Sequence, residues 1–252
     1  MKSRYLRTSE IAKAVGVHPN TVRLYEQWGF LPPVPRSPGG YRLFTEAHLD
    51  QMRLARLALH FTWLGGDIRK AAAALIYQSA AGDLGGALEQ AYRLLAAVQA
   101  ERAQAEVAAN LLERWAQGAA TDVTEKPLRI AETAELLGVT TDALRNWERN
   151  GLIQVPRDPH NRYRLYGAAE IGRLRVIRML RRARYSMMSI LRMLLHLDAG
   201  KGGDLRRVLD TPSPDDDIFY GTDRWLSFLT ELEQHATEAI ALLEEMIRKQ
   251  QG

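Results

Sequence analysis

An internal repeat is the feature that most constrains how this 252-residue chain can fold. Shifting the sequence by 122 residues places residues 6–44 over 128–166, and the alignment continues without a gap to Ile68 over Ile190. Sixteen of the 63 aligned pairs are identical, and they include two pairs of turn glycines, among them Gly16 over Gly138. A repeat of this kind predicts two copies of one folding unit.

Each copy predicts the same order of short elements. In the first, Thr8 is predicted to cap a helix at 9–14, and Gly16 can end it with the positive φ that glycine tolerates. A second helix is predicted from Pro19 or Asn20 through Trp28, because proline fits the first turn of a helix. Two short helices joined by a glycine turn form a helix-turn-helix. The proline-rich stretch that follows predicts a loop or two-stranded wing, after which Thr45 caps a longer helix.

The charge of the chain is unevenly distributed. Residues 1–60 carry a net charge of +5 and residues 128–196 carry +7, whereas the rest carries −8 and the whole chain +4. Two basic regions on acidic connecting material indicate a polyanionic partner. On charge alone, two solvated basic faces remain an equal alternative.

Composition excludes several other classes of protein. Apolar residues make up 46% and charged residues 25%, as in ordinary soluble domains, and no apolar run reaches the ~18 residues of a membrane span. The N-terminus lacks the apolar core of a signal peptide, so we expect a cytoplasmic protein with no membrane partner. There are no cysteines, which removes disulfides and thiolate metal sites. The six histidines are scattered, and the acidic run at 215–217 and the pair His235 and Glu238 are typical of solvated surface. We therefore expect no metal site, no cofactor and, without a catalytic motif, no enzyme.

Motifs in both copies resemble those of the mercury-resistance regulator (MerR) family. The first copy contains TVRLYEQWGFL at 21–31 and GGYRLF at 39–44. The second contains ALRNWERNGLI at 143–153 and NRYRLY at 161–166, a slightly weaker match. The resemblance covers about 140 residues and combines helix, turn and wing at fixed spacing. It implies two winged helix-turn-helix heads that bind double-stranded promoter DNA.

The candidate DNA-binding residues follow from this resemblance and from their chemistry. A recognition helix presents its first residues to base edges, where Arg suits guanine and Asn suits adenine. An aromatic residue in each recognition helix and the basic and aromatic residues of each wing are expected on the sugar-phosphate backbone. The candidates in the first head are Asn20, Thr21, Arg23, Tyr25, Arg36, Tyr41 and Arg42. Those in the second head are Thr141, Asp142, Arg145, Trp147, Arg157, Arg162, Tyr163 and Arg164.

Some of these residues have an alternative structural interpretation. Tyr41 and Tyr163 could serve mainly in packing. Glu26 and Glu148 are predicted to be structural and to hold an arginine in place. The second head departs from the family pattern because Asp142 puts a carboxylate near the groove, so we expect the two heads to read different half-sites.

A long helix is predicted after each head. Apolar residues at alternating spacings of three and four recur at 88–112 and at 225–246, which is typical of a coiled-coil seam, although a core helix in a bundle would give a similar pattern. Arg102 is the one charged seam position, with Glu233 as its suggested partner. The seam positions are Leu88, Ala91, Leu95, Val98, Arg102, Ala105, Ala109 and Leu112, and Trp225, Leu229, Leu232, Ala236, Ala239, Leu243 and Met246.

The expected fold is mainly α, with two winged helix-turn-helix heads and two long helices that pair as an antiparallel coiled coil. One chain would then be a monomeric pseudo-dimer, with a homodimer as the alternative. The expected domains are head 1 (1–80), a first long helix (81–118), a linker (119–127), head 2 (128–200), an acidic loop (201–222) and a second long helix (223–252).

The resemblance implies a transcription regulator on the nucleoid that distorts promoter DNA in response to a small-molecule or other signal, and that affects RNA polymerase holoenzyme indirectly. The alternative is a ligand-free architectural or excisionase-like protein that only bends DNA. Aromatic residues near the helix ends suggest an effector pocket, with ordinary packing as the simpler interpretation. The candidates for this pocket are Trp63, Tyr77, Tyr185, Phe219, Tyr220 and Trp225.

Overall fold

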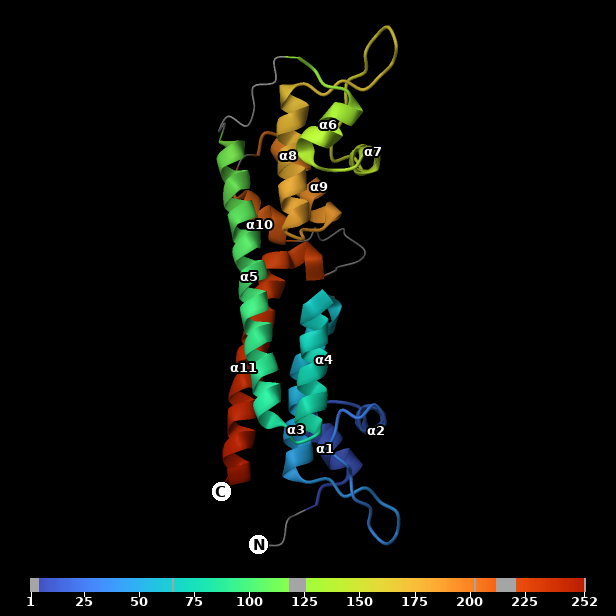
Figure 1. Cartoon of the computed structure of the whole chain (residues 1–252), viewed down its shortest axis with the longest axis vertical. Coiled ribbons are helices and arrows are strands. Elements are labelled where there is room, and N and C mark those ends of the chain that lie inside the picture. The colour runs from blue at the N-terminus through green and yellow to red at the C-terminus, as the bar shows by residue number, and fades with distance from the viewer. Residues whose placement is uncertain (1–4, 65, 118–125, 202, 212–220, 252) are drawn as a thin grey trace. The chain divides into compact units, whose positions relative to one another are not determined.

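The computed structural model describes residues 5–64, 66–117, 126–201, 203–211 and 221–251, without the side chains of 63, 221 and 222 (Figure 1). The described residues are largely helical; they contain isolated antiparallel bridges but no extended strand. They form two compact units, unit 1 from Met1–Ala100 with Thr230–Gly252, and unit 2 from Glu101–Leu229. The predicted mainly α fold with two helix-turn-helix regions is therefore confirmed.

Unit 1 contains head 1. Its helices are α1 (Thr8–Val15), α2 (Pro19–Gln27), α3 (Glu46–Leu59) and α4 (Gly66–Ala80), with a short 3-10 helix, η1 (His60–Leu64), between the last two.

The ends of α1 have different causes. Thr8 lies inside the helix, so the prediction that it is the cap was wrong by one residue. Arg7 is the N-cap, and its backbone N–H donates to Glu10 Oε2 at 2.7 Å. A glutamate three residues into the helix can thus satisfy the first free N–H. At the other end Gly16 has φ 67° and ends α1 as predicted.

Unit 2 repeats this arrangement in head 2. Its helices are α6 (Ile130–Leu137), α7 (Thr141–Arg149), α8 (Ala168–Arg182) and α9 (Met187–Asp198), and the starts of α6, α7 and α8 lie 122 residues after those of α1, α2 and α3. An antiparallel bridge from Leu6 to Phe44 ties the start of head 1 to the end of its wing. Leu128 and Tyr166 form the same bridge in head 2.

The two wings differ by a one-residue shift that the gapless alignment missed. In head 1, Arg36 bridges Arg42 across five residues; in head 2, Arg157 bridges Arg164 across six. The gapless alignment would place Asp158, not Arg157, over Arg36. Compared with head 1, head 2 has one residue more in its hairpin and one residue fewer between its second helix and the hairpin. The two changes in length cancel, so the alignment shows no gap.

The long helices are α5 (Leu84–Ala116) and α11 (Trp225–Gln251), and each contributes to both units. All seven predicted seam positions of α11 are buried. In α5, Leu88 and Leu95 are only half-buried, whereas Leu84, Ala87 and Leu94 are buried, so the buried face is wider than a two-position seam.

Within unit 1, two hydrogen bonds join α5 to α11. Tyr92 OH donates to Glu244 at 3.4 Å and Gln99 Nε2 donates to Glu233 at 2.9 Å. The partner number falls as the α5 number rises, so the two segments run antiparallel here. Arg102 is half-buried and lies 3.8 Å from Glu106. The coiled coil as a whole and the pairing of Arg102 with Glu233 stay predictions.

Part of the segment expected to be an acidic loop is helical. It contains α10 (Leu205–Asp210) and leads into η2 (Gly221–Arg224) before α11. The carboxylate of Asp210 accepts from the backbone N–H of Ser227 at 3.2 Å and so helps to hold the first turn of α11. The acidic run at 215–217 and most of the predicted linker lie outside the described residues. Across the described residues, none of the helices combines the length and apolarity that a membrane crossing requires.

Candidate nucleic-acid interface

The predicted recognition helices, α2 and α7, are fixed at their N-termini by local capping. His18 precedes α2, and its Nδ1 accepts from the backbone N–H of Asn20 at 3.2 Å. Thr140 precedes α7, and its hydroxyl accepts from Ala143 N at 3.1 Å. These contacts satisfy backbone N–H groups that the first turn leaves free. The side chains of the first turn therefore lie at the surface on a fixed backbone.

Each recognition helix carries an exposed arginine that is held by the residue one turn before it. Arg23 donates to Asn20 Oδ1 at 3.0 Å in head 1. Arg145 donates to Asp142 Oδ1 at 2.8 Å in head 2. The Asn–Arg pair keeps a net charge of +1, whereas the Asp–Arg pair is neutral. Thr21 and Thr141 lie beside them, each half-buried. The same geometry thus offers two different sets of donors and acceptors to a DNA groove.

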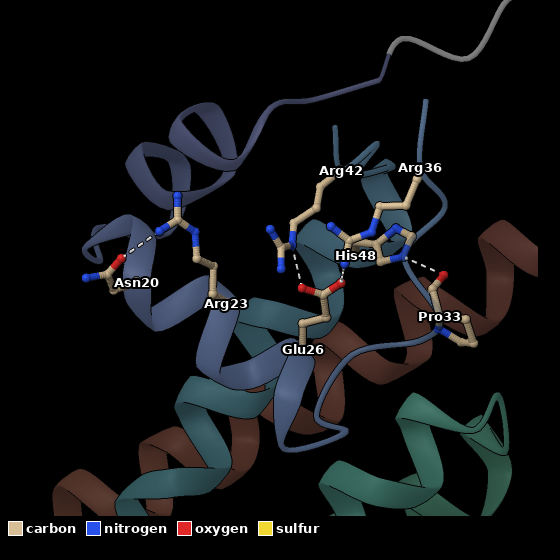
Figure 2. A network of polar contacts seen from close by, with 7 residues as sticks. All are labelled: Asn20, Arg23, Glu26, Pro33, Arg36, Arg42 and His48. Carbon is tan, nitrogen blue, oxygen red and sulfur yellow. Dashed lines mark hydrogen bonds and ion pairs between the residues drawn. The ribbon is translucent and has the colours of Figure 1, made fainter. Parts of the chain in front are cut away.

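A glutamate in each recognition helix binds two arginines of the wing. Figure 2 shows Glu26 between Arg36 and Arg42, which donate to its two carboxylate oxygens at 2.8 and 2.5 Å. Glu148 accepts from Arg157 at 3.2 Å and from Arg164 at 2.6 Å. The prediction that these glutamates hold an arginine is confirmed, with two arginines each.

This repeated arrangement has a consequence for phosphate binding. The glutamates are 18% and 19% exposed, whereas the outer arginines, Arg36 and Arg157, are 45% and 40% exposed. Two guanidinium groups on one carboxylate leave an excess charge of +1 and several N–H donors at the surface of each wing. A planar donor group held in a fixed orientation suits phosphate oxygens.

The aromatic residues of the recognition helices are more buried than expected for backbone contacts. Tyr25 and Trp147 are each only 7% exposed. Tyr25 packs edge-on to Phe30 with 5.5 Å between ring centres, and burial raises the pKa of its hydroxyl. Their main contribution is to the head cores, so at most a polar edge of each ring can reach DNA.

The wing tips expose the other aromatic candidates. Tyr41 is 77% exposed and Tyr163 is 58% exposed, so neither is a core residue. The residue before each tyrosine has a positive φ, 77° at Gly40 and 63° at Arg162. A left-handed conformation costs a non-glycine residue about 1–2 kcal/mol. Head 2 therefore places an arginine side chain at its wing tip in a backbone conformation that would favour glycine.

His48 is a positioning residue that sequence reasoning missed. It is the third residue of α3 and 5% exposed, and its Nδ1 accepts from Thr45 N at 3.0 Å. Figure 2 shows its ring beside the Pro33 carbonyl, which lies 3.4 Å from Nε2. Burial lowers the pKa of this imidazole; the Pro33 carbonyl and the Glu26 charge act in the opposite direction. In head 2, Glu170 makes the same cap by accepting from Gly167 N at 2.9 Å. A glutamate at this position in one copy was the signal that could have identified the histidine.

The candidate effector residues that the structure describes belong to both units, and the predicted effector pocket stays a prediction. Tyr77 belongs to unit 1, is 51% exposed and packs edge-on against Phe30. Tyr185 and Trp225 belong to unit 2 and are 0% and 1% exposed. Tyr185 OH donates to the Ala105 carbonyl at 3.2 Å, and burial raises its pKa. Phe219 and Tyr220, and the side chain of Trp63, lie outside the described part of the chain.

No group of three or more potential metal-binding side chains forms among the residues described.

Comparisons with known proteins point to one family. The family described as "MerR family regulatory protein" matches residues 7–44, and "MerR HTH family regulatory protein" matches 128–197. The HTH-type transcriptional regulator CueR of Escherichia coli O157:H7 is 38% identical over 53 residues, which is 21% of this chain and 39% of that protein. The HTH-type transcriptional regulator ZntR of Escherichia coli K12 is 38% identical over 52 residues, 21% of this chain and 37% of that protein.

The matched part of the chain thus spans about two fifths of the length of these curated relatives. No solved structure gives a significant match. Both matched regions contain a helix-turn-helix, α1–α2 and α6–α7, followed by a wing whose arginines are held by a glutamate of the second helix. Residues 7–44 and 128–197 of this chain are thus two helix-turn-helix regions of the MerR family of regulators.

Proposed function

We propose that the chain is a sequence-specific transcription regulator that binds an asymmetric operator as a single-chain pseudo-dimer. The observation that carries this proposal is the pair of unlike recognition helices in one chain. Asn20 with Arg23 can read adenine and guanine, whereas Asp142 can accept from the amino group of cytosine. The relatives are named transcriptional regulators, which favours regulation over enzymatic activity.

A pseudo-dimer is supported by the contacts between the two long helices within unit 1. Glu233 and Glu244 of α11 accept from α5 side chains in antiparallel order. One chain supplies both helices, so no second chain is needed to complete this pair. Each head then comes with its own long helix, as two separate subunits would provide.

We further propose that the bound promoter DNA is distorted in response to a signal and that RNA polymerase holoenzyme responds to the altered DNA. Bending or twisting a site of 20–30 base pairs costs on the order of 1–6 kcal/mol, which is within reach of a ligand's differential binding energy. Wing arginines at both ends of a site would hold the phosphates against this deformation.

Selection of bound sequences from a random DNA library tests the proposal. The wild type should yield a non-palindromic consensus, and the mass of the complex should correspond to one 28.4 kDa chain per site. Arg23→Ala should relax base preference in one half-site and Arg145→Ala in the other, each at about 1–3 kcal/mol.

Two further variants separate base reading from charge. Arg149→Ala removes an exposed charge from the last turn of α7 and should leave the consensus unchanged. Asp142→Asn should make the head 2 preference more like that of head 1, because it recreates the Asn–Arg pair. A palindromic wild-type consensus, or an Arg23 variant that loses both half-sites equally, would contradict the proposal.

A further inference from the structure

Head 2 contains a surface cavity of about 530 Å³ inside unit 2. It lies beside the first turn of α8, near the end of α9, with Trp115 of α5 in its wall. Its volume is within the range of pockets that hold small organic ligands. Its lining includes the side chains of Trp115, Ile153, Glu170, Arg173, Leu195 and Asp198.

The cavity coincides with a difference between the two repeats. In head 1, Asp50 is 3% exposed and binds Lys249 of α11 at 2.9 Å, so its carboxylate ties α3 to a long helix. The corresponding residue of head 2 is Gly172, which lines the cavity and has no side chain to make such a tie. A second exchange at the rim replaces Glu46 of head 1 by Ala168.

The polar floor of the cavity is also specific to head 2. In head 1, Gln51 donates to the Phe30 carbonyl at 2.9 Å and to the Ile76 carbonyl at 3.2 Å. Arg173 replaces Gln51 and Asp198 replaces Ile76. Arg173 Nε donates to the Leu152 carbonyl at 2.7 Å, and its two terminal nitrogens bind Asp198 at 2.6 and 2.8 Å.

The charge and surface of this site define a class of ligand. Two carboxylates, Glu170 and Asp198, and one guanidinium, Arg173, line the cavity, so the lining has a net charge of −1. Arg173 holds the pKa of Asp198 below its usual range, which keeps that carboxylate charged at neutral pH. The apolar part includes Leu195, which is 58% exposed, and the indole of Trp115. Aromatic faces and carboxylates together favour cations with apolar bodies.

We propose that this cavity of head 2 binds a hydrophobic organic monocation. The indole of Trp115 and the aliphatic side chains contact its apolar groups, and the carboxylates of Glu170 and Asp198 attract its charge. The inference gives the signal of the proposed function a chemical class. Ligand binding by unit 2 is measured without DNA, so failure of either proposal can be distinguished from failure of the other.

Two probes of matched shape and opposite charge test the inference. Tetraphenylphosphonium and tetraphenylborate are titrated into the full chain without DNA, and binding is followed by calorimetry and tryptophan fluorescence. We expect the cation to bind with one-to-one stoichiometry and the anion to bind at least about tenfold more weakly. Equal or tighter binding of the anion, or no binding of the cation, would overturn the inference.

Variants locate the site. Asp198→Asn and Trp115→Leu should each weaken binding of the cation about tenfold. Ala168→Trp places a bulky side chain at the rim from an exposed position and leaves the ion pair between Arg173 and Asp198 in place. It should also abolish binding of the cation. This variant tests the site even where Asp198→Asn lowers the stability of the head.

Control variants with similar chemistry lie away from the cavity. Glu135→Gln removes an exposed carboxylate of the same head, and Trp28→Ala removes a half-exposed indole of head 1. Both should bind the cation as the wild type does. If the cavity variants bind the cation unchanged, or the controls lose it equally, the cation does not occupy this cavity and the inference is wrong.

Discussion

Protonation of His48 should destabilise head 1 and leave head 2 unaffected. Nδ1 accepts a hydrogen bond from the backbone N–H of Thr45 at 3.0 Å, so in the folded head this nitrogen carries no proton. The proton of the neutral ring is then on Nε2, which faces the Pro33 carbonyl at 3.4 Å. Adding a second proton would place two N–H groups against each other and put a charge in a buried position.

The sign and size of the effect follow from proton linkage. Burial lowers the pKa of His48 in the folded state. As the pH falls below about 6.5, the unfolded chain therefore binds more protons than the folded chain does, and the free energy of unfolding decreases as the pH falls. One proton limits the slope to about 1.4 kcal/mol per pH unit, and the loss ends below the folded pKa. Glu26 opposes the shift through its charge, which narrows the pH window but does not reverse the sign.

The assay is urea unfolding between pH 5 and pH 8, compared between the wild type and His48→Gln. Glutamine can make the same capping contact at the third helical position without titrating. We expect the free energy of unfolding of the variant to fall less steeply between pH 6.5 and pH 5 than that of the wild type, because the variant lacks the titrating imidazole. Glu170→Gln in head 2 is the matched control and should leave the dependence over this range unchanged. Identical pH profiles for the wild type and His48→Gln would refute the reasoning.

Two further outcomes follow from the wings. Glu26→Gln should destabilise the chain by about 1–2 kcal/mol, because each of two partly exposed arginines loses a charged partner, and a double-mutant cycle with Arg42→Gln should give a coupling of about 1 kcal/mol. Purely additive effects would show that the ion pair contributes nothing. Arg162→Gly should stabilise the wing by about 0.5–1 kcal/mol after the extra chain entropy of glycine is subtracted, yet weaken binding to all DNA sequences. The reverse change, Gly40→Arg, should destabilise head 1, and a stable Gly40→Arg variant would argue against strain at this position.

The sequence predicted the elements whose causes are local. Gly16 ends α1 and Thr45 precedes α3, because the backbone conformation that each adopts depends on a few neighbouring residues. The repeat then transferred the ends of these helices to the other head, where Gly138 ends α6 and α8 begins 122 residues after α3. The mistake at Thr8 has the same origin, since a nearby glutamate can cap a helix as well as a hydroxyl can.

Features that depend on contacts between distant residues could not be read in this way. The pattern at 88–112 identified a long helix, but a helix that packs against both a head and a second helix buries a wider face than a heptad seam suggests. The one-residue shift in the wing of head 2 was hidden because two opposite changes in length cancel. The bridge between Arg157 and Arg164 locates the hairpin, and this pairing is visible in the structure but not in the sequence.

The comparison of the two heads then indicates where function diverged. Positions with a common task keep a common residue, as Glu26 and Glu148 do when each binds two wing arginines. Where the residues differ, the contacts differ as well. Asp50 binds a long helix while Gly172 borders a cavity, and Gln51 donates to backbone carbonyls while Arg173 also pairs with Asp198. Because both heads lie in one chain, they can differ in sequence and need not make the same contacts. One head can therefore keep a closed helix contact while the other exposes a pocket, which two identical subunits of a homodimer could not do.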